Sequence, residues 1–579
     1  FNRYFKNDDG LINLVSRLNY YLSSYRRKQL FFLFILIILL SFAEAISLAS
    51  IIPFIGVFVQ PDLFYSNPWL KNFINFFEIS NHDQLFLLVT IIFVSLIIIS
   101  FLIRLISLYL TNKISSFIEA DLKSKIFEYN ISQPYNYHLT QNSNDIMSSI
   151  VQKTTAIAIY LNAFIQILSC LLSVFFILGV LLIIQPFIIL AVTIIVILFF
   201  SMVTFINKRK IFENSKKISE NQDNIVSIFQ DSVGYISEII LYSLHDIFVK
   251  KFDKSTYQIA KSNTYNKNVQ ESPRIYLEFI TLLGLAIIIF IFKQNNNEIV
   301  SSLTILAALG YGTQKVIPLI NRIYVCNASM RSVQALIIDC LTILDSSKKE
   351  KNNSTNLEKI TFNDSIKLKN INFSFNNDEN FILENINLDI KKGSKVGIKG
   401  TTGRGKSTLG NIIISLLNPT QGQLYIDDIL INHQNKLAWQ KNIAIVPQNV
   451  FLNDVSIAEN IAIGIEPKDI NLEKVRKFAE LAQINNFIEK TPHQYNEKVG
   501  ERGIKLSGGQ KQRIGIARAL YREAKVIVFD EATNQLDEET ENLIMQSINN
   551  FDSEITVVFI THRLSTLKYC DQIIDLDKF

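Results

Sequence analysis

Long apolar runs constrain the fold of this chain more than any other feature of its sequence. A helix of about 18 or more mainly apolar residues is long enough to cross the hydrocarbon core of a bilayer. The part of the chain before residue 330 contains such runs repeatedly. We therefore expect a membrane domain of six helices, at Leu30–Val59, Leu85–Leu110, Tyr160–Ile184, Phe187–Ile206, Ile275–Phe292 and Val300–Ile323.

Composition and charge agree with a membrane protein. The 579 residues are 49% hydrophobic and 19% charged, whereas soluble proteins carry roughly a quarter charged residues. A net charge of +5 is small for this length and argues against nucleic acid as a partner. The four cysteines are scattered without a CxxC pair, so neither a zinc site nor a disulfide framework is indicated.

The distribution of basic residues predicts the orientation of the helices. Lys and Arg are frequent before the first run, between the second and third, and between the fourth and fifth. The loop 60–84, by contrast, contains a single Lys and several acidic residues. Because basic residues favour the cytoplasmic side, we expect both termini and the two long loops there. The Gln185-Pro186 pair predicts a tight hairpin between the third and fourth helices.

The two long loops have helical rather than linker composition. Asn112–Phe127 and Ile211–Val233 mix polar and apolar residues and lack the Gly and Pro of a flexible connection. Twenty helical residues would extend a membrane helix by roughly 30 Å. We expect such stalks to turn near Gln133–His138 and Tyr235–Leu244 and to meet the C-terminal domain. The alternative is a pair of surface helices.

Ionisable residues, among them Glu44, Arg104 and Lys315, lie within the predicted membrane helices. Charge inside a bilayer is costly, so Glu44, Arg104 and Lys315 should face a cavity or each other. Glu44 and Arg104 fall in adjacent helices and would be able to pair. In the external loop, the apolar residues of Asn67–Ser80 recur at helical spacing. They predict a short amphipathic helix at the membrane surface, or a loop helix packed on the protein.

The sequence changes character after the membrane part. A polar segment around 345–357 is followed by alternating short apolar and helical runs. We expect a transmembrane domain at 1–344, a linker at 345–364 and an α/β nucleotide-binding domain at 365–579.

A phosphate-binding loop is the clearest motif of the C-terminal domain. Residues 400–407 read GTTGRGKS and match the pattern GxxxxGK[ST], between a predicted strand at Lys395–Ile398 and a predicted helix at Thr408–Leu417. Backbone N–H groups would surround the phosphates, Lys406 would neutralise their charge, and the Ser407 hydroxyl would reach Mg²⁺. The predicted contacts with ATP come from Gly400, Thr401, Thr402, Gly403, Arg404, Gly405, Lys406, Ser407 and Thr408.

Two further apolar strands end in candidate catalytic residues. The run Val526–Phe529 leads into Asp530, suited to hold Mg²⁺, and Glu531, suited to polarise the attacking water. By itself this pattern also fits an ordinary strand followed by a helix cap. The strand Ile555–Thr561 ends at His562, which would reach the same edge of the sheet.

The segment Leu506–Gln510, LSGGQ, precedes a predicted helix at Lys511–Tyr521 and resembles the signature of ATP-binding cassette (ABC) transporters. The resemblance extends over the whole chain and implies six helices fused to an α/β P-loop ATPase cassette. It also implies a dimer, a homodimer or a heterodimer, in which ATP lies between the P-loop of one copy and the signature of the other. The residues that it adds to the ATP site are Phe375 for adenine stacking, Gln448 as a catalytic and Mg²⁺-linked residue, Ser507, Gly508, Gly509 and Gln510 of the signature, Asp537 of the D-loop, and His562 as the switch histidine. The D-loop departs from the usual Ser-Ala at Asn534 and Gln535.

Within the exporters, parts of the membrane domain are similar to bacterial flippases of lipid-linked oligosaccharides of the PglK type. Ser41–Ile55, Pro273–Glu278 and the segment Lys315–Arg322 carry this resemblance. It implies a multi-pass protein of the bacterial inner membrane with a cytoplasmic ATPase. Lys315 and Arg322 would then suit an anionic head group, although they would equally suit the phosphates of the inner leaflet. Other lipids, peptides or drugs are the alternative cargoes, and an ATP-gated channel or a regulator is the alternative class.

Overall fold

The computed structural model describes residues 10–59, 82–140, 143–184, 186–294, 299–350, 360–375, 381–549 and 554–578. The chain divides into two compact units. The first, the membrane unit, consists of residues 1–133 and 140–349. The second, the ATPase unit, consists of residues 134–139 and 350–579. The predicted external helix Asn67–Ser80 lies outside the described residues.

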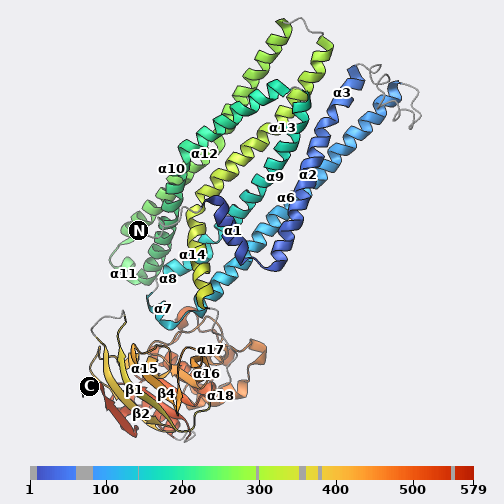
Figure 1. Cartoon of the computed structure of the whole chain (residues 1–579). Helices are drawn as coiled ribbons and strands as arrows, with labels where there is room; N and C mark the ends of the chain where they lie inside the picture. The colour runs from blue at the N-terminus through green and yellow to red at the C-terminus, as the bar shows by residue number, and fades with distance from the viewer. Residues whose placement is uncertain are drawn as a thin grey trace. The chain divides into compact units, whose positions relative to one another are not determined.

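The membrane unit consists of long helices that run alongside one another (Figure 1). Helix α9 (Thr155–Ile184) packs against α13 (Ile299–Ser332) and α2 (Ser24–Ala49). Helix α10 (Pro186–Gly234) packs against α12 (His245–Gln294). Among the described residues, three helical stretches are long and apolar enough to cross a membrane: Ser24–Phe58, His82–Ser132 and Ile146–Ile183. The helices of this unit are α1 (Leu11–Tyr21), α2 (Ser24–Ala49), α3 (Ile51–Val59), α6 (His82–Ser132), α8 (Ser143–Ser148), the π-helix η1 (Ser149–Lys153), α9 (Thr155–Ile184), α10 (Pro186–Gly234), α11 (Ile236–Leu241), α12 (His245–Gln294), α13 (Ile299–Ser332) and α14 (Gln334–Glu350). The short helix α7 (Tyr135–Thr140), which follows α6 in the chain, belongs to the ATPase unit except for its last residue.

The first predicted membrane helix is divided in the structure. Helix α2 ends at Ala49 and α3 begins at Ile51, whereas the sequence suggested one helix through Val59. Pro53 has no N–H to donate to the carbonyl of Ala49, so the helical ladder is interrupted there. The Ser50 hydroxyl donates instead to the carbonyl of Ser47, at 2.9 Å.

Both long segments that the sequence predicted to be stalks are continuous with the apolar helices before them. Helix α6 has 51 residues and includes Asn112–Phe127, which gives it a length of roughly 75 Å. Helix α10 has 49 residues and includes Ile211–Val233. Apolar residues at helical spacing, such as Ile118, Leu122 and Ile126, bury one face of the α6 extension.

A buried lysine joins three separate segments of the membrane unit. Lys153, at the end of η1, is 6% exposed. Its ammonium donates to Asp223 on α10 at 3.0 Å and to Asp339 on α14 at 3.1 Å. The Ser219 hydroxyl donates to the same Asp339 oxygen at 2.9 Å, and the Ser148 hydroxyl donates to Asp223. One cation therefore compensates two partly buried carboxylates.

The ATPase unit contains two sheets. The first is antiparallel, in the order β2-β1-β4-β5, and the second is parallel, in the order β6-β7-β8-β3-β9. The strands are β1 (Ser365–Phe373), β2 (Leu383–Lys391), β3 (Lys395–Lys399), β4 (Gln421–Ile426), β5 (Ile429–Leu430), β6 (Ile443–Val446), β7 (Val526–Asp530), β8 (Thr556–Ile560) and β9 (Gln572–Asp575). In the parallel sheet, the carboxyl ends of β3, β6, β7 and β8 therefore share one edge.

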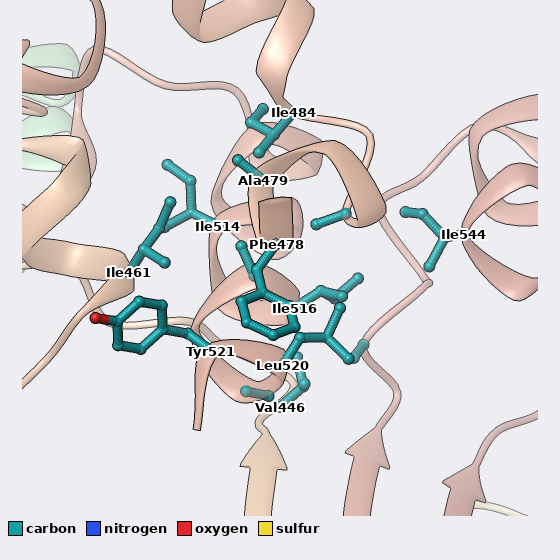
Figure 2. Packing of buried hydrophobic residues seen from close by; sticks show 14 of the residues in the cluster. Val446, Ile461, Phe478, Ala479, Ile484, Ile514, Ile516, Leu520, Tyr521 and Ile544 are labelled. Carbon is teal, nitrogen blue, oxygen red and sulfur yellow. The ribbon is translucent and has the colours of Figure 1, made fainter. Parts of the chain in front are cut away.

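Helices cover the parallel sheet and supply much of its core. Those described are α15 (Lys406–Ile413), α16 (Lys436–Gln440), α17 (Ile457–Ile461), α18 (Leu472–Leu481), α19 (Asn485–Glu489), α20 (Gly508–Tyr521), α21 (Glu538–Asn549) and α22 (Leu564–Leu567). Figure 2 shows Phe478 of α18 beside Ile516 and Leu520 of α20, with Val446 at the end of β6 below them. The continuous apolar sequence of β7 and β8 is typical of strands buried on both faces.

Candidate functional site

The P-loop connects β3 to α15. Gly405, with φ 78°, is the N-cap of α15, and a Cβ there would lie 2.9 Å from side-chain atoms of Ile382 and Leu383. A larger residue would therefore be both strained and crowded. The ammonium of Lys406 donates to the carbonyls of Gly400 and Thr401, at 2.9 and 3.0 Å. The lysine lies back across its own loop, where its charge would face phosphate oxygens.

The helix after the P-loop differs in its bounds from the sequence prediction. We expected Thr408–Leu417, but α15 begins at Lys406 and ends at Ile413. Lys406 and Ser407 therefore belong to the first turn, whose free N–H groups attract anions. Ser415, with φ 55°, lies in the left-handed region, which ends the helix before Leu417.

A serine and a carboxylate meet at the edge of the parallel sheet. The Ser407 hydroxyl, from α15, donates to Oδ1 of Asp530, the last residue of β7, at 3.0 Å. Burial raises the pKa of Asp530, the Ser407 hydrogen bond opposes that effect, and the neighbouring charge of Glu531 adds to it. A hydroxyl and a carboxylate are the hard oxygen ligands that Mg²⁺ prefers. The donor set therefore fits the ion that the sequence predicted here.

The carboxylate of Glu531, which follows β7, contacts side chains that follow β6 and β8. Its Oε2 accepts from Nε2 of Gln448, after β6, at 2.7 Å. Its Oε1 lies 3.4 Å from Nε2 of His562, after β8. The backbone of Glu531 is in the left-handed region, with φ 48°, and its N–H donates to the carbonyl of Ile560 at 2.8 Å. Strained positions of this kind are typical of functional sites.

The signature segment forms the start of a helix. The Ser507 hydroxyl accepts from the N–H of Gln510 at 3.3 Å, and the Gln510 side chain accepts from the N–H of Ser507 at 2.8 Å. This capping box places Gly508 and Gly509 inside the first turn of α20, which begins three residues earlier than the predicted start at Lys511. The N–H groups of that turn would suit a phosphate.

Phe375 and Asp537, two further residues that were predicted to contact ATP, contact other residues of the ATPase unit. The ring of Phe375 packs edge to face on Phe373, with 5.0 Å between centroids, and the side chain is 41% exposed. An exposed ring is available for stacking. Asp537 accepts from the N–H and the hydroxyl of Thr540, at 2.9 and 2.8 Å, and so caps α21.

Two residues of the site were missed by sequence reasoning. Asp577 follows β9 and accepts from the N–H of Thr401 at 3.0 Å and from its hydroxyl at 2.8 Å. These hydrogen bonds hold the pKa of Asp577 below its usual value. Asn534 donates from its side-chain amide to Oε2 of Glu531 at 3.1 Å. Asp577 is 176 residues from Thr401, so no local pattern indicates the contact, whereas the unusual D-loop sequence did draw attention to Asn534.

The membrane unit contains a polar cavity of about 530 Å³. Each of five helices contributes one of its polar lining residues: Glu44 from α2, Arg104 from α6, Gln166 from α9, Arg274 from α12 and Arg322 from α13. Glu44 is 6% exposed. Three of the four residues that the sequence suggested for a cargo site therefore line one cavity.

Hydrogen-bond acceptors in this cavity lack partners. Oε2 of Glu44 and Oδ1 of Asn321 are buried and accept no hydrogen bond within the described part of the chain. Glu44 and Arg104, both in described helices, form no ion pair within 4.0 Å, so the predicted pair is not made here. Arg322 donates to Oε1 of Gln166 at 2.5 Å. A ligand of this cavity would meet both exposed guanidinium groups and acceptors that need donors.

Lys315 has a different environment from the other three residues. Its ammonium donates to the Ser47 hydroxyl on α2 at 2.8 Å, and it does not line the cavity. Sequence reasoning also missed Arg274 and Glu278, which form an i,i+4 ion pair at 2.8 Å beside the cavity. Their spacing on one helix face was the available signal.

Sequence comparisons identify both units. The profile of the family described as ABC transporter matches residues 383–534, and the profile of the ABC transporter transmembrane region matches residues 29–294. An ATP-dependent lipid A-core flippase of Shewanella denitrificans is 27% identical over 480 residues, which are 82% of this chain and 78% of that protein. The leukotoxin export ATP-binding protein LtxB of Aggregatibacter actinomycetemcomitans is 43% identical over 230 residues, which are 39% of this chain and only 32% of the relative.

A solved structure shares the fold. The structure of a bacterial Atm1-family ABC exporter with ATP bound superimposes with a TM-score of 0.76, covering 95% of this chain and 94% of that one. The sequence identity is 20%, so this likeness speaks for the fold alone.

Proposed function

The chain belongs to the ABC transporters in which a transmembrane region is fused to an ATPase domain, and from this premise we propose that it is a flippase for an amphiphile with a phosphate-bearing, hydroxyl-rich head group. A lipid-linked oligosaccharide or a related glycolipid is the proposed cargo. The family couples ATP hydrolysis to transport. The observation that carries the proposal is the cavity shared by Glu44, Arg104 and Arg322.

The chemistry of the cavity supports this class of cargo. Arg104 and Arg322 would donate charge-assisted hydrogen bonds to phosphate oxygens. The unpartnered acceptors of Glu44 and Asn321 would accept from sugar hydroxyl or amino groups, because a buried acceptor without a donor is costly. The flippases of lipid A-core, which resemble this chain over most of its length, are named for a glycolipid.

The proposed working unit is a homodimer in the bacterial inner membrane, with the ATPase in the cytoplasm. ATP would lie between Gly400–Ser407 of one copy and Ser507 and Gly509 of the other. Binding of ATP would shift the population toward a closed dimer, because ATP contacts both copies only in that state. Hydrolysis would then return the dimer to the state that accepts cargo.

The residues at the sheet edge suggest how ATP would be hydrolysed. Lys406 would bind the terminal phosphates, and Glu531 would accept a proton from the attacking water. Ser407, Asp530 and Gln448 would hold Mg²⁺, which supplies charge neutralisation at the phosphates. His562, beside Oε1 of Glu531, would contact the terminal phosphate.

Transport of labelled lipid-linked oligosaccharide in proteoliposomes tests the proposal. We expect ATP-dependent movement of this lipid and none of a simple phospholipid. Arg104→Ala should lower the transport rate about tenfold, since one charge-assisted hydrogen bond is lost. Arg209→Ala, which removes an exposed ion pair on α10, should not change the rate. Movement of another lipid, a peptide or a drug instead would replace the proposed cargo. Hydrolysis with no movement of any amphiphile would favour a channel or a regulator.

The raised pKa of Asp530 predicts a pH-dependent requirement for Mg²⁺. Because the pKa lies above its ordinary value, the carboxyl takes up its proton at a higher pH than a free aspartate does. Mg²⁺ must displace that proton, so its affinity should fall as the pH falls toward this raised value. We expect the Mg²⁺ concentration for half-maximal hydrolysis to rise as the pH is lowered from neutral through the acid range. A requirement that does not change with pH over this range would contradict the prediction.

A further inference from the structure

Asn534 is placed to act on the proposed catalytic carboxylate. Its side-chain nitrogen donates to Oε2 of Glu531 at 3.1 Å, and Nε2 of Gln448 donates to the same oxygen at 2.7 Å. His562 lies instead beside Oε1, at 3.4 Å. The two oxygens of Glu531 thus have different neighbours. Two side-chain amides donate hydrogen bonds to Oε2, and a histidine lies beside Oε1.

The backbone around Asn534 is held by hydrogen bonds from Arg563. Nη2 of Arg563 donates to the carbonyl of Asn534 at 2.9 Å, and Nη1 donates to the carbonyl of Leu536 at 3.2 Å. The same guanidinium pairs with Glu541, which is 1% exposed, at 2.6 Å. The N–H of Asn534 also donates to the carbonyl of Glu531 at 3.2 Å. Three hydrogen bonds therefore hold the loop from which the amide projects, as a group that orients a catalytic side chain requires.

The number of lone pairs on each carboxylate oxygen decides which oxygen of Glu531 can accept from water. Each oxygen of an ionised carboxylate has about two acceptor sites. The two amide donors occupy those of Oε2, so Oε1 is the oxygen left to accept from water. We propose that Asn534 is a positioning residue of the ATPase, which with Gln448 fixes the plane of the Glu531 carboxylate and directs Oε1 to the reaction. This rests on the proposed role of Glu531 in hydrolysis, and it holds for any cargo.

The type of side chain at position 534 matters for this role. The amide of Asn reaches Glu531 as a neutral donor, and Ala at this position would leave Oε2 with Gln448 alone. Asp would place a second negative charge against the carboxylate, which is unfavourable at such a short distance. Ser, more usual in this position of the family, offers a hydroxyl donor on a side chain that is shorter by one bond.

Steady-state ATP hydrolysis by the full-length protein in lipid tests the inference. For Asn534→Ala we expect kcat to fall about tenfold, because one hydrogen bond to a charged group is lost. The KM for ATP should stay unchanged within twofold. Asn534→Asp should lower kcat further, and Asn534→Ser should recover part of it. Asn485→Ala is the matched control, because Asn485 also donates its amide to a glutamate, Glu489, at 3.1 Å, on α19. This control should keep both constants.

A second measurement separates positioning from a structural role. In a Glu531→Gln background no carboxylate remains to be positioned, so adding Asn534→Ala should leave the dissociation constant of a fluorescent ATP analogue unchanged. A loss of affinity there would assign Asn534 a structural role and overturn the inference. Unchanged kcat in Asn534→Ala would also overturn it. If Glu531→Gln itself still hydrolyses ATP, the proposed role of Glu531 fails instead, which is a distinguishable result.

Discussion

Replacement of Glu531 by Gln is expected to lower ATP hydrolysis by roughly 10²–10⁴-fold, the usual contribution of a positioned general base. Gln keeps the size of the side chain and one acceptor oxygen for the neighbouring amides but cannot accept a proton from water. The P-loop and its Lys406 are unchanged, so ATP binding should persist. Binding without turnover should trap the closed dimer that we propose, because the step that reopens it is lost.

Two measurements check this expectation. Phosphate release gives the turnover number, and a fluorescent ATP analogue gives the affinity. Glu489→Gln is the matched control, since Glu489 also accepts an Asn amide but lies on α19 and, within the described part of the chain, forms no hydrogen bond with Glu531, Gln448 or His562. The control should keep both values. Hydrolysis by Glu531→Gln within tenfold of the unmodified protein would remove the base role from this residue.

The second large effect is expected in the membrane unit, at Lys153. Replacement by Met keeps much of the side-chain volume but removes the cation that Asp223 and Asp339 share. Two partly buried carboxylates would then lose the cation that lies between them. Breaking a buried ion pair in this way costs about 3–5 kcal/mol. Because the three residues belong to η1, α10 and α14, the loss should loosen the packing among all three segments.

Thermal unfolding in detergent measures the effect of Lys153→Met. We expect a clear decrease in the unfolding temperature, compared with little change for Arg209→Gln, whose ion pair with Glu213 is exposed. The triple variant Lys153→Met, Asp223→Asn, Asp339→Asn should recover part of the loss, since it removes the uncompensated charges as well. An unfolding temperature for Lys153→Met equal to that of the unmodified protein would contradict the prediction.

Motifs confined to one stretch of chain were accessible from the sequence. The pattern of residues 400–407 requires a strand before it and a helix after it, and β3 and α15 supply both. The bounds of the helices were less accessible. Lys406 and Gly508 each lie inside a helix that we expected to start later, because capping by Gly405 and by the Ser507–Gln510 box decides the first turn.

Contacts between distant residues were not accessible in the same way. The hydrogen bond from Thr401 to Asp577 and the ion pairs of Lys153 connect residues 70 or more positions apart. Hydropathy and motif spacing carry no record of such pairs. The ion pair that we predicted between Glu44 and Arg104 is not formed for the same reason. That two helices are adjacent does not specify which of their faces meet.

The order of residues alone was enough to predict the two halves of this protein and the chemistry of one of them. Long apolar runs are excluded from water, and a P-loop binds phosphate through its own local backbone, so both features can be recognised without knowing how the chain packs. The remaining features depend on packing. It brought Glu44, Arg104 and Arg322 to one cavity while Lys315 contacts Ser47, and it placed Asn534 and Gln448 on the same oxygen of Glu531. These outcomes depend on how helices and strands pack. That packing is the combined result of many weak contacts across the whole unit.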